Sequence, residues 1–336
     1  MINIAINGLG RVGRTALKLV MDNPGIELVA INDLTSLENL VYLLRYDSVY
    51  GRYQKAVRAV DGNLDIDGQI IRAFNDADPE SLPWRQLGVD LVFECTGAFR
   101  TLGDLEKHIR AGSKHVMLSA PGRKGDIPSV VYGVNDIAEP APACFSTASC
   151  TTNCIAPVVE IMHRHLGVKK AMLTTVHAYT ASQGVVDMPS RNMERGRCAG
   201  LNMIPTTTGA ASATGEVLPE HKGRFDGAAI RVPVATGSIS DITFVTGRET
   251  SVTEVNDIFR LEAQSQRYGG VLGVAEDPIV SADIIGDPRA AIVDMRSTRV
   301  VDGDLVKVFA WYDNEWGYAS QMIRQALKIF ATGSSA

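Results

Sequence analysis

One cysteine and one histidine are spaced so that the chain could assemble a thiol nucleophile and its base. Cys150 comes after a short apolar run and before the helical pattern of residues 155–166, so we expect it at the start of a helix. Unpaired N–H groups and the positive end of the helix dipole stabilise a thiolate there. His177 lies twenty-seven residues further on, in an alternating segment that puts it on one strand face with Thr175 and Tyr179. This arrangement favours a thiolate and imidazolium pair.

Other residues of the same types have less specific interpretations. A buried cysteine is more often inert packing, and we assign that role to Cys154, four residues after Cys150. The remaining histidines lie in segments without a comparable group of reactive side chains and are interpreted as structural or surface residues: His108, His115, His163, His165 and His221. The five cysteines form an odd, sparse set without CxxC pairs, and no HExxH motif is present. The sequence therefore predicts neither a disulfide framework nor a metal site.

A glycine-rich turn near the N-terminus predicts a dinucleotide site. Residues 8–13 match G-x-G-x-x-G between the predicted strand Ile2–Asn7 and the predicted helix Arg11–Met21. The glycines permit a tight turn and close approach of a pyrophosphate, to which N–H groups at the helix start donate. Asp33 follows the predicted strand 27–32, where its carboxylate accepts from ribose hydroxyls and repels a 2′-phosphate. The pattern predicts NAD rather than NADP; a ligand-free glycine turn with a helix-capping Asp33 is the alternative.

The elements that must position these residues fall into two patterns. Short strands alternate with helices in the first half, which predicts right-handed parallel units: strands 91–94 and 115–118, and helices 37–44 and 102–111. After about residue 150 the strands are longer and antiparallel in character: 169–179, 228–234, 238–245 and 305–312. We predict an α/β fold with a Rossmann-type, doubly wound, mainly parallel sheet and a second α+β catalytic domain with a mixed or antiparallel sheet.

The predicted domain boundaries follow from the same patterns. Residues 1–149 with 317–336 form the NAD-binding domain, and residues 150–316 form the catalytic substrate domain. The last helical pattern, 317–331, is expected to pack back on the first domain. The segment from about 180 to 200 is an irregular, polar loop.

Length and composition set outer limits on the function. With 336 residues, 45% of them hydrophobic, two domains are the natural expectation. The net charge of −5 gives no general reason to expect nucleic acid or an anionic membrane as the main partner. The N-terminus lacks the pattern of a signal peptide, and no run of about 18 apolar residues predicts a membrane span. We expect a cytoplasmic protein.

Six segments together resemble the phosphorylating, type I glyceraldehyde-3-phosphate dehydrogenase family. They occur in the family's order and span nearly the whole chain: 5–11, 45–48, 149–154, 174–177, 206–211 and 311–318. The resemblance implies oxidation of D-glyceraldehyde 3-phosphate with NAD and inorganic phosphate to 1,3-bisphosphoglycerate and NADH, in glycolysis or gluconeogenesis. Cys150 would form a thiohemiacetal and then a thioester, which phosphate attacks, while His177 takes the hydroxyl proton. The family is typically a homotetramer.

The resemblance also assigns roles to individual residues. Cofactor positions are Asn7, Gly8, Gly10, Arg11, Val12, Asp33, Thr96, Gly97, Ser119, Asn314 and Tyr318. Thr180 and Arg231 match the substrate-phosphate site, Ser149, Thr151, Thr208 and Gly209 the attacking-phosphate site, and Arg197 an arginine that usually also contacts substrate. Pro189 matches a proline that accompanies NAD preference.

The chain departs from the family pattern at a few positions. Ala77 stands where many members carry an arginine near the adenine, Val234 and Thr236 replace the usual Thr and Asn after a proline, and Cys95 replaces a Ser or Thr. These changes concern a cofactor contact and the shape of the substrate pocket.

Three rival functions fit parts of the pattern. An erythrose-4-phosphate dehydrogenase shares the reactive residues but normally differs around Pro189. A non-enzymatic nucleotide- or RNA-binding protein on the same scaffold would have no need of Cys150 and His177, and the acidic net charge weakens nonspecific binding. A papain-like protease would not explain the glycine motif.

Overall fold

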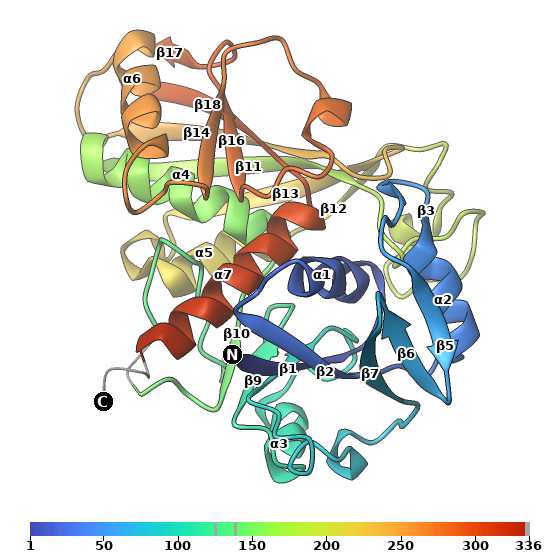
Figure 1. Ribbon diagram of the computed structural model, residues 1–336. Helices are drawn as coiled ribbons and strands as arrows, with labels where there is room; N and C mark the ends of the chain where they lie inside the picture. Colours follow the sequence, from blue (N-terminus) through green and yellow to red (C-terminus); the bar gives the residue numbers. More distant parts are fainter. Residues whose placement is uncertain (124–125, 138–139, 333–336) are drawn as a thin grey trace. The chain divides into compact units, whose positions relative to one another are not determined.

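The computed structural model describes residues 1–123, 126–137 and 140–332, in two compact units (Figure 1). The first unit contains Met1–Val130, Asp136–Ala148 and the C-terminal part from Met322; the second contains Val131–Asn135 and Ser149–Gln321. The change between units therefore falls at Ser149 and inside the last helix, α7 (Trp316–Thr332).

The first unit is built on a mainly parallel sheet. Within the described residues its order is β10-β9-β8-β1-β2-β7-β6-β5. The parallel strands are β1 (Ile2–Asn7), β2 (Ile26–Asn32), β7 (Gln69–Phe74), β8 (Leu91–Glu94), β9 (His115–Leu118) and β10 (Cys144–Ser146). Renumbered by chain order, these strands run 3-2-1-4-5-6, the doubly wound arrangement. The predicted Rossmann-type fold is confirmed.

Helices of this unit begin where the sequence supplies capping groups. They are α1 (Arg11–Met21), α2 (Leu37–Arg45) and α3 (Leu102–Arg110). The Ser36 hydroxyl caps α2, and Thr101 with Asp104 forms a capping box at α3. The α1 helix instead follows Gly10, which has no side chain to cap it.

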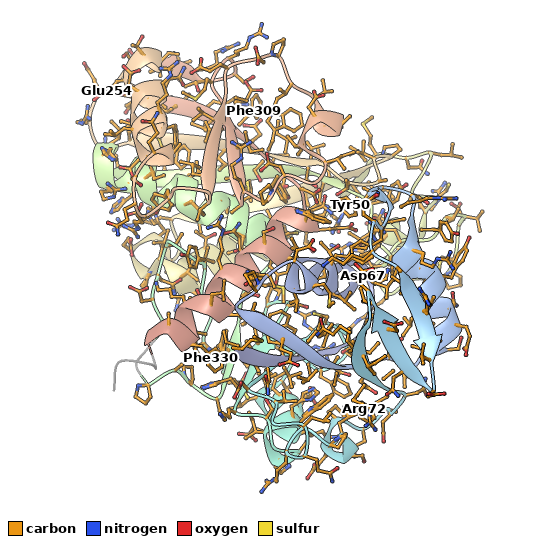
Figure 2. All side chains as sticks on the ribbon, viewed as in Figure 1. Tyr50, Asp67, Arg72, Glu254, Phe309 and Phe330 are labelled. Carbon is orange, nitrogen blue, oxygen red and sulfur yellow. The ribbon has the colours of Figure 1, made fainter. Side chains whose placement is uncertain are left out.

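An antiparallel ribbon at one edge of this sheet was not predicted. It consists of β5 (Val57–Val60), β6 (Asn63–Ile66) and β7, joined by the two-residue turns Asp61-Gly62 and Asp67-Gly68. All four turn residues have positive φ, as type I′ hairpin turns require. Figure 2 labels Asp67 at the second turn and Arg72 on β7. The two Asp-Gly pairs were a usable hairpin signal in the sequence.

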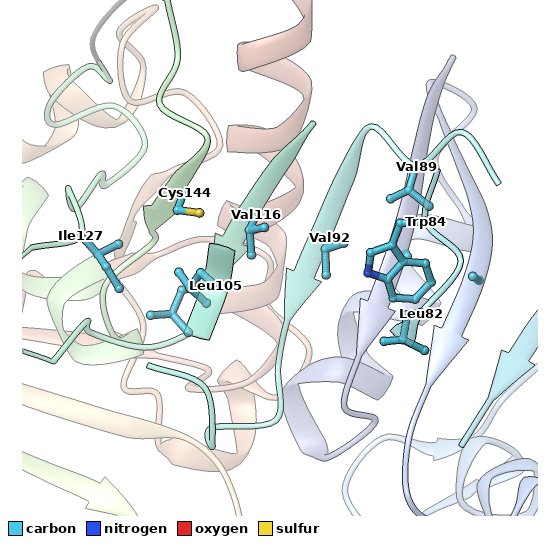
Figure 3. Close-up of a cluster of buried hydrophobic side chains, with 11 residues drawn as sticks. Leu82, Trp84, Val89, Val92, Leu105, Val116, Ile127 and Cys144 are labelled. Carbon is cyan, nitrogen blue, oxygen red and sulfur yellow. The ribbon is translucent and has the colours of Figure 1, made fainter. Parts of the chain in front are cut away.

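A hydrophobic cluster fixes the first sheet against its neighbouring segments (Figure 3). It includes Val92 from β8, Val116 from β9, Leu105 from α3, and Trp84, all fully buried. Hydrophobic packing thus stabilises the strands, and polar groups lie at their carboxyl ends.

The second unit is built on a mixed sheet. Within the described residues its order is β12-β13-β11-β14-β18-β16-β15, with β17 paired to β18. The strands are β11 (Val168–Ala178), β12 (Ile204–Thr207), β13 (Phe225–Val232), β14 (Ser238–Thr246), β15 (Leu272–Ala275), β16 (Ala291–Asp294), β17 (Arg299–Val301) and β18 (Leu305–Tyr312). Its other helices are α4 (Cys150–Leu166), α5 (Ala210–Val217) and α6 (Val252–Ala263). The predicted mixed α+β architecture is confirmed.

Two smaller observations complete the fold. The strands β3 (Tyr46–Asp47) and β4 (Gly51–Arg52) form a separate two-stranded sheet.

Among the helices in the described part of the chain, none has the length and apolar character needed to cross a membrane.

Candidate active site

The start of α4 and the end of β11 bring a thiol and an imidazole together. Cys150 is the first residue of α4, and the Ser149 hydroxyl caps this helix by accepting from Thr152 N at 3.1 Å. His177 is the penultimate residue of β11. Its Nε2 lies 3.4 Å from Cys150 Sγ, within hydrogen-bonding range for sulfur. The predicted proximity of these two residues is therefore present in the structure.

Tyr312, at the end of β18, links the elements that carry this pair. Its hydroxyl lies 2.9 Å from the hydroxyl of Thr151 on α4 and 2.9 Å from that of Thr175 on β11. Its ring meets the His177 ring edge-on, with centroids 6.0 Å apart. The side chain is buried. The sequence motif around Tyr312 was noted, but only the tertiary structure identifies this bridging contact.

The charges of the pair differ from the sequence-based expectation. Burial raises the pKa of the Cys150 thiol, although Arg231 and hydrogen bonds from Thr151 oppose this shift. Burial, with a further contribution from Arg231, lowers the pKa of His177 to about 3. Both directions disfavour a preformed thiolate–imidazolium pair and favour a thiol beside a neutral imidazole. The ion pair therefore stays a prediction, and a thiolate formed here is stabilised by Arg231 and the helix start.

The second nitrogen of His177 is held by two neighbours. The Ala178 carbonyl oxygen lies 2.6 Å from Nδ1, and Arg231 Nη1 lies 2.7 Å from the same atom. The two contacts need opposite protonation states of Nδ1, because Ala178 O can only accept and a guanidinium N–H can only donate. When the proton is on Nδ1 it is donated to Ala178 O, and Nε2 is unprotonated toward Cys150 Sγ. Arg231 then donates to Ala178 O, at 2.9 Å. In this tautomer Nε2 can accept a proton.

Arg231 is placed beside the pair by strand register. It lies on β13, directly opposite His177 in the parallel pairing of β11 with β13. Its Nε is buried and has no hydrogen-bond partner in the structure, which leaves a charged donor without an acceptor. An anion would provide the missing acceptor for this donor.

Thr180, the other residue predicted for the substrate phosphate, follows β11, and its hydroxyl lies 2.8 Å from that of Ser182.

A second arginine near this cluster is Arg195, not Arg197. Arg195 donates from Nε to Thr206 Oγ1 at 2.9 Å and from Nη2 to Thr207 O at 3.2 Å, along β12. Its charge lowers the pKa of both His177 and Arg231.

Arg197 has a different environment. It pairs with Asp187 at 2.9 Å, and the two side chains are 63% and 59% exposed. The structure does not bring Arg197 to the cluster. Arg195, two residues earlier, was missed because a sequence with several nearby arginines does not show which of them lies beside the reacting pair.

The start of α5 offers the remaining residues predicted for phosphate. Thr208 accepts through its hydroxyl from Ala210 N at 3.1 Å, and Gly209 precedes the helix without a capping side chain. A Cβ added at Gly209 would meet no atom within 4 Å. The space beside Gly209 is therefore open, and an anion can approach this helix start there.

In the first unit, the glycine turn before α1 has the form expected for a dinucleotide. Gly8 has a φ of +89° and lies so close to Thr96 that a Cβ would approach its backbone to 2.6 Å. A Cβ at Gly13 would lie 2.0 Å from Gly8 O, so the turn closes tightly on the helix. At Gly10 a Cβ would meet nothing within 4 Å. The open space in front of α1, without a capping side chain, fits a pyrophosphate.

Asp33 and Arg11 shape this turn further. Asp33 accepts from Leu9 N at 2.6 Å and from Thr35 N at 2.8 Å, so its carboxylate is fixed beside the glycines. Arg11 donates to Asp47 at 2.6 Å and lies 5.4 Å from the ring centre of Tyr50, labelled in Figure 2. The Arg11 guanidinium is thus used within the protein, and the groups that Arg11 and Val12 offer at the start of α1 are their backbone N–H groups.

Asn7 has a different position from that expected of a cofactor contact. Its side chain is buried, and both amide atoms are used internally, with Glu94 and with Asn32. We therefore correct its role to a supporting one.

The other cofactor positions of the first unit lie at strand ends. Thr96 and Gly97 are exposed after β8, and Ser119 is half-buried after β9. These are carboxyl ends of parallel strands, where ligands bind in this fold. The neighbouring Cys95, a departure from the family pattern, accepts a hydrogen bond from Ser119, and burial raises the pKa of its thiol to about 12.

The last two cofactor positions belong to the second unit. Asn314 Oδ1 accepts from Ser238 Oγ at 3.0 Å, Gly237 N at 3.2 Å and Thr236 Oγ1 at 3.3 Å. Thr236, one of the departures, thus helps to orient this amide. Tyr318 is buried in α7.

Comparison with known proteins gives a consistent result. A family model described as "Glyceraldehyde 3-phosphate dehydrogenase, NAD binding domain" matches residues 2–102, and one described as "Glyceraldehyde 3-phosphate dehydrogenase, C-terminal domain" matches residues 149–314.

Curated proteins that resemble this chain over nearly its whole length are named glyceraldehyde-3-phosphate dehydrogenase. The chain is 47% identical over 326 residues to the glyceraldehyde-3-phosphate dehydrogenase of Thermotoga maritima, covering 96% of this chain and 97% of that one. It is 43% identical to those of Borreliella burgdorferi (98% and 99% covered) and Geobacillus stearothermophilus (99% of each). The rival functions weighed from sequence receive no support.

Proposed function

Because the chain belongs to the glyceraldehyde 3-phosphate dehydrogenase family, we propose that Cys150 and His177 carry out the phosphorylating oxidation of glyceraldehyde 3-phosphate. The reaction consumes NAD and inorganic phosphate and gives 1,3-bisphosphoglycerate and NADH. The contact of 3.4 Å between Cys150 Sγ and His177 Nε2, at the start of α4, is the observation that carries this assignment.

The first step is formation of a thiohemiacetal on Cys150. The sulfur attacks the aldehyde carbon, and the S–H proton passes to His177 Nε2 and then to the carbonyl oxygen. The substrate is not oxidised in this step. Arg231 and the N–H groups of the α4 start stabilise the thiolate during attack. Bound NAD supplies the acceptor for the hydride that the thiohemiacetal carbon loses. His177 takes the hydroxyl proton in the same step, which leaves a thioester on Cys150.

Phosphate then cleaves the thioester. A phosphate oxygen attacks the acyl carbon, the carbon–sulfur bond breaks, and the Cys150 sulfur leaves as a thiolate that regains its proton from His177. Ser149, Thr151, Thr208 and the backbone of Gly209 are the groups we assign to the attacking phosphate, and Thr180 with Arg231 to the substrate phosphate. The unpartnered Nε of Arg231 supports an anion beside the pair.

The residues that we assign to NAD are those given by the family resemblance, apart from Asn7. They are the turn of Gly8 and Gly10, the backbone of Arg11 and Val12, Asp33, Thr96, Gly97, Ser119, Asn314 and Tyr318. The domain limits 1–149 with 317–336, and 150–316, are proposed on the same grounds. The uncapped start of α1 and the fixed Asp33 carboxylate support NAD.

The activity test follows NADH absorbance with the purified chain. With glyceraldehyde 3-phosphate and NAD, we expect steady NADH formation only when inorganic phosphate is present. Without phosphate, a single burst followed by a stall is expected, because the thioester accumulates. Reaction of erythrose 4-phosphate in place of the triose phosphate would contradict the substrate assignment.

Arg195 and Arg197 offer a matched pair of variants. We also assign Arg195 to phosphate, because its charge lies near enough to His177 and Arg231 to act on the pKa of both. Arg195→Ala should then lower kcat/KM for phosphate by about 10- to 100-fold, the effect of losing a hydrogen bond from a charged donor to an anion. Arg197→Ala should leave it unchanged, because its ion pair with Asp187 is exposed. Steady-state kinetics at varied phosphate concentration measures kcat/KM for both variants. A larger loss in Arg197→Ala than in Arg195→Ala would support the contact with substrate that the sequence predicted for Arg197.

We propose a homotetramer, and the segment from 180 to 203 supplies its contact surface. Its part from about 180 to 200 was expected to be polar, yet the segment exposes several apolar side chains: Val185 at 85%, Met193 at 84%, Leu201 at 84% and Met203 at 76%. A second copy covering them would remove apolar surface from water. Sedimentation should give four times the 36.2 kDa chain mass, and Met193→Glu should shift it toward smaller species. A cytoplasmic location is part of the same proposal.

A further inference from the structure

Buried side chains connect the carboxyl ends of neighbouring parallel strands in the first unit. Asn7 ends β1, Asn32 ends β2 and Glu94 ends β8, and the register pairs Asn7 with both of the others. Asn32 Nδ2 donates to Asn7 Oδ1 at 2.7 Å, and Asn7 Nδ2 donates to Glu94 Oε2 at 2.6 Å. On its other side, Asn32 bonds the N–H and the carbonyl of Asp76, just after β7, both at 2.9 Å. The hydrogen bonds run continuously from β8 to the end of β7.

Glu94 is the only carboxylate in this row of side chains and is fully buried. Its Oε2 accepts from Asn7 and from His108 Nε2, at 2.6 and 3.2 Å. Its Oε1 accepts from the N–H of Thr96 at 2.8 Å and from the Thr96 hydroxyl. The two oxygens of Glu94 thus have four donors within hydrogen-bonding distance, two on each oxygen.

Trp84 fixes the direction of the bond from His108. The indole Nε1 donates to His108 Nδ1 at 2.9 Å. An indole N–H can only donate, so Nδ1 is unprotonated and the ring proton is on Nε2, facing Glu94. Trp84 is part of the hydrophobic cluster in Figure 3. The polar row is thereby anchored in the core.

We propose that Glu94 and Asn32 are positioning residues for the dinucleotide, a role that rests on the proposed NAD-dependent function. Each residue of the row directly precedes a cofactor segment: Gly8 follows Asn7, Asp33 follows Asn32, and Thr96 is held by Glu94 itself. The buried bonds keep these segments in place before NAD binds. The ligand then has less backbone to order, and its affinity is higher.

Glu94→Gln tests this role with little change in size. Whichever way the amide is turned, its NH₂ group replaces an acceptor and faces two donors. We expect the Kd for NAD, measured by isothermal titration calorimetry on the full chain, to rise at least about tenfold, equivalent to about 1.4 kcal/mol. KM for NAD should rise in parallel, with KM for inorganic phosphate unchanged.

Glu106→Gln is the matched control, since Glu106 is an exposed residue of α3 that undergoes the same chemical change. Its Kd for NAD should equal that of the wild type. The rate of Cys150 alkylation by iodoacetamide, which reports on the second unit, should be unchanged in both variants.

The outcomes separate this inference from the proposed function. If the wild type binds NAD and folded Glu94→Gln binds it with the same Kd, the positioning role is wrong. If the wild type itself does not bind NAD, the proposed function is wrong. Should Glu94→Gln not fold, Asn32→Asp decides by the same tenfold criterion, because it sets a carboxylate against Asn7 Oδ1 and the Asp76 carbonyl.

Discussion

Replacing Cys150 by serine should abolish phosphate-dependent NADH formation, with a loss of about four orders of magnitude or more in kcat. A serine hydroxyl is a much weaker nucleophile than a thiol, and no neighbouring group replaces the covalent step. Since Cys150 is the first residue of α4 and Ser149 provides the cap, the substitution should not disturb the helix. Initial rates at saturating substrates measure the effect.

A matched control is Cys154→Ser, one turn further along α4. Cys154 is buried, its Sγ donates to the Ala310 carbonyl at 3.7 Å, and burial raises the pKa of its thiol. The substitution removes no group that we assign to the reaction, so activity should remain close to that of the wild type. Full activity of Cys150→Ser, or equal losses in both variants, would contradict the assignment of the nucleophile.

Replacing His177 by glutamine should lower kcat by about 100- to 10,000-fold, the usual contribution of a general base. Glutamine can donate and accept hydrogen bonds but cannot take the hydroxyl proton during hydride loss. The burst of NADH in the absence of phosphate isolates this step, and its rate should fall with kcat. If the variant shows a normal burst rate but slow turnover, His177 acts in the cleavage of the thioester by phosphate and not in hydride loss. His165→Gln, at a half-buried histidine paired with Glu262, is the control and should keep wild-type kcat.

The pH dependence of the wild type follows from the two shifted groups. A base is active when unprotonated, and because the pKa of His177 is lowered to about 3, it remains competent throughout the range from about pH 5 to 9. The thiol is reactive as a thiolate, and burial raises its pKa, so alkylation of Cys150 should accelerate as pH rises. Iodoacetamide kinetics measure this rate. An inflection near pH 6 that disappears in His177→Gln would show that the imidazolium pair exists after all.

Regular periodicity made most of the fold predictable. The strand at 2–7, the helix at 11–21 and the strand at 305–312 have the predicted ends, because their apolar spacing and glycine boundaries are local properties. The ribbon of β5 to β7 was missed although its Asp-Gly turns are also local. The loop from about 180 to 200 is predicted to be polar, whereas the structure exposes apolar residues in it, among them Val185 and Met193.

The sequence alone predicted the reacting residues and determined the class of cofactor. A cysteine before a helix, a histidine on a strand and an acidic residue after the second strand depend only on local patterns and spacing. Tertiary structure decided which groups act on them: Arg231 faces His177 through strand register, Arg195 rather than Arg197 lies near both, and Tyr312 links α4 to β11. These contacts join residues distant in the chain, and burial, which sets the charges of Cys150 and His177, exists only once the strands have packed.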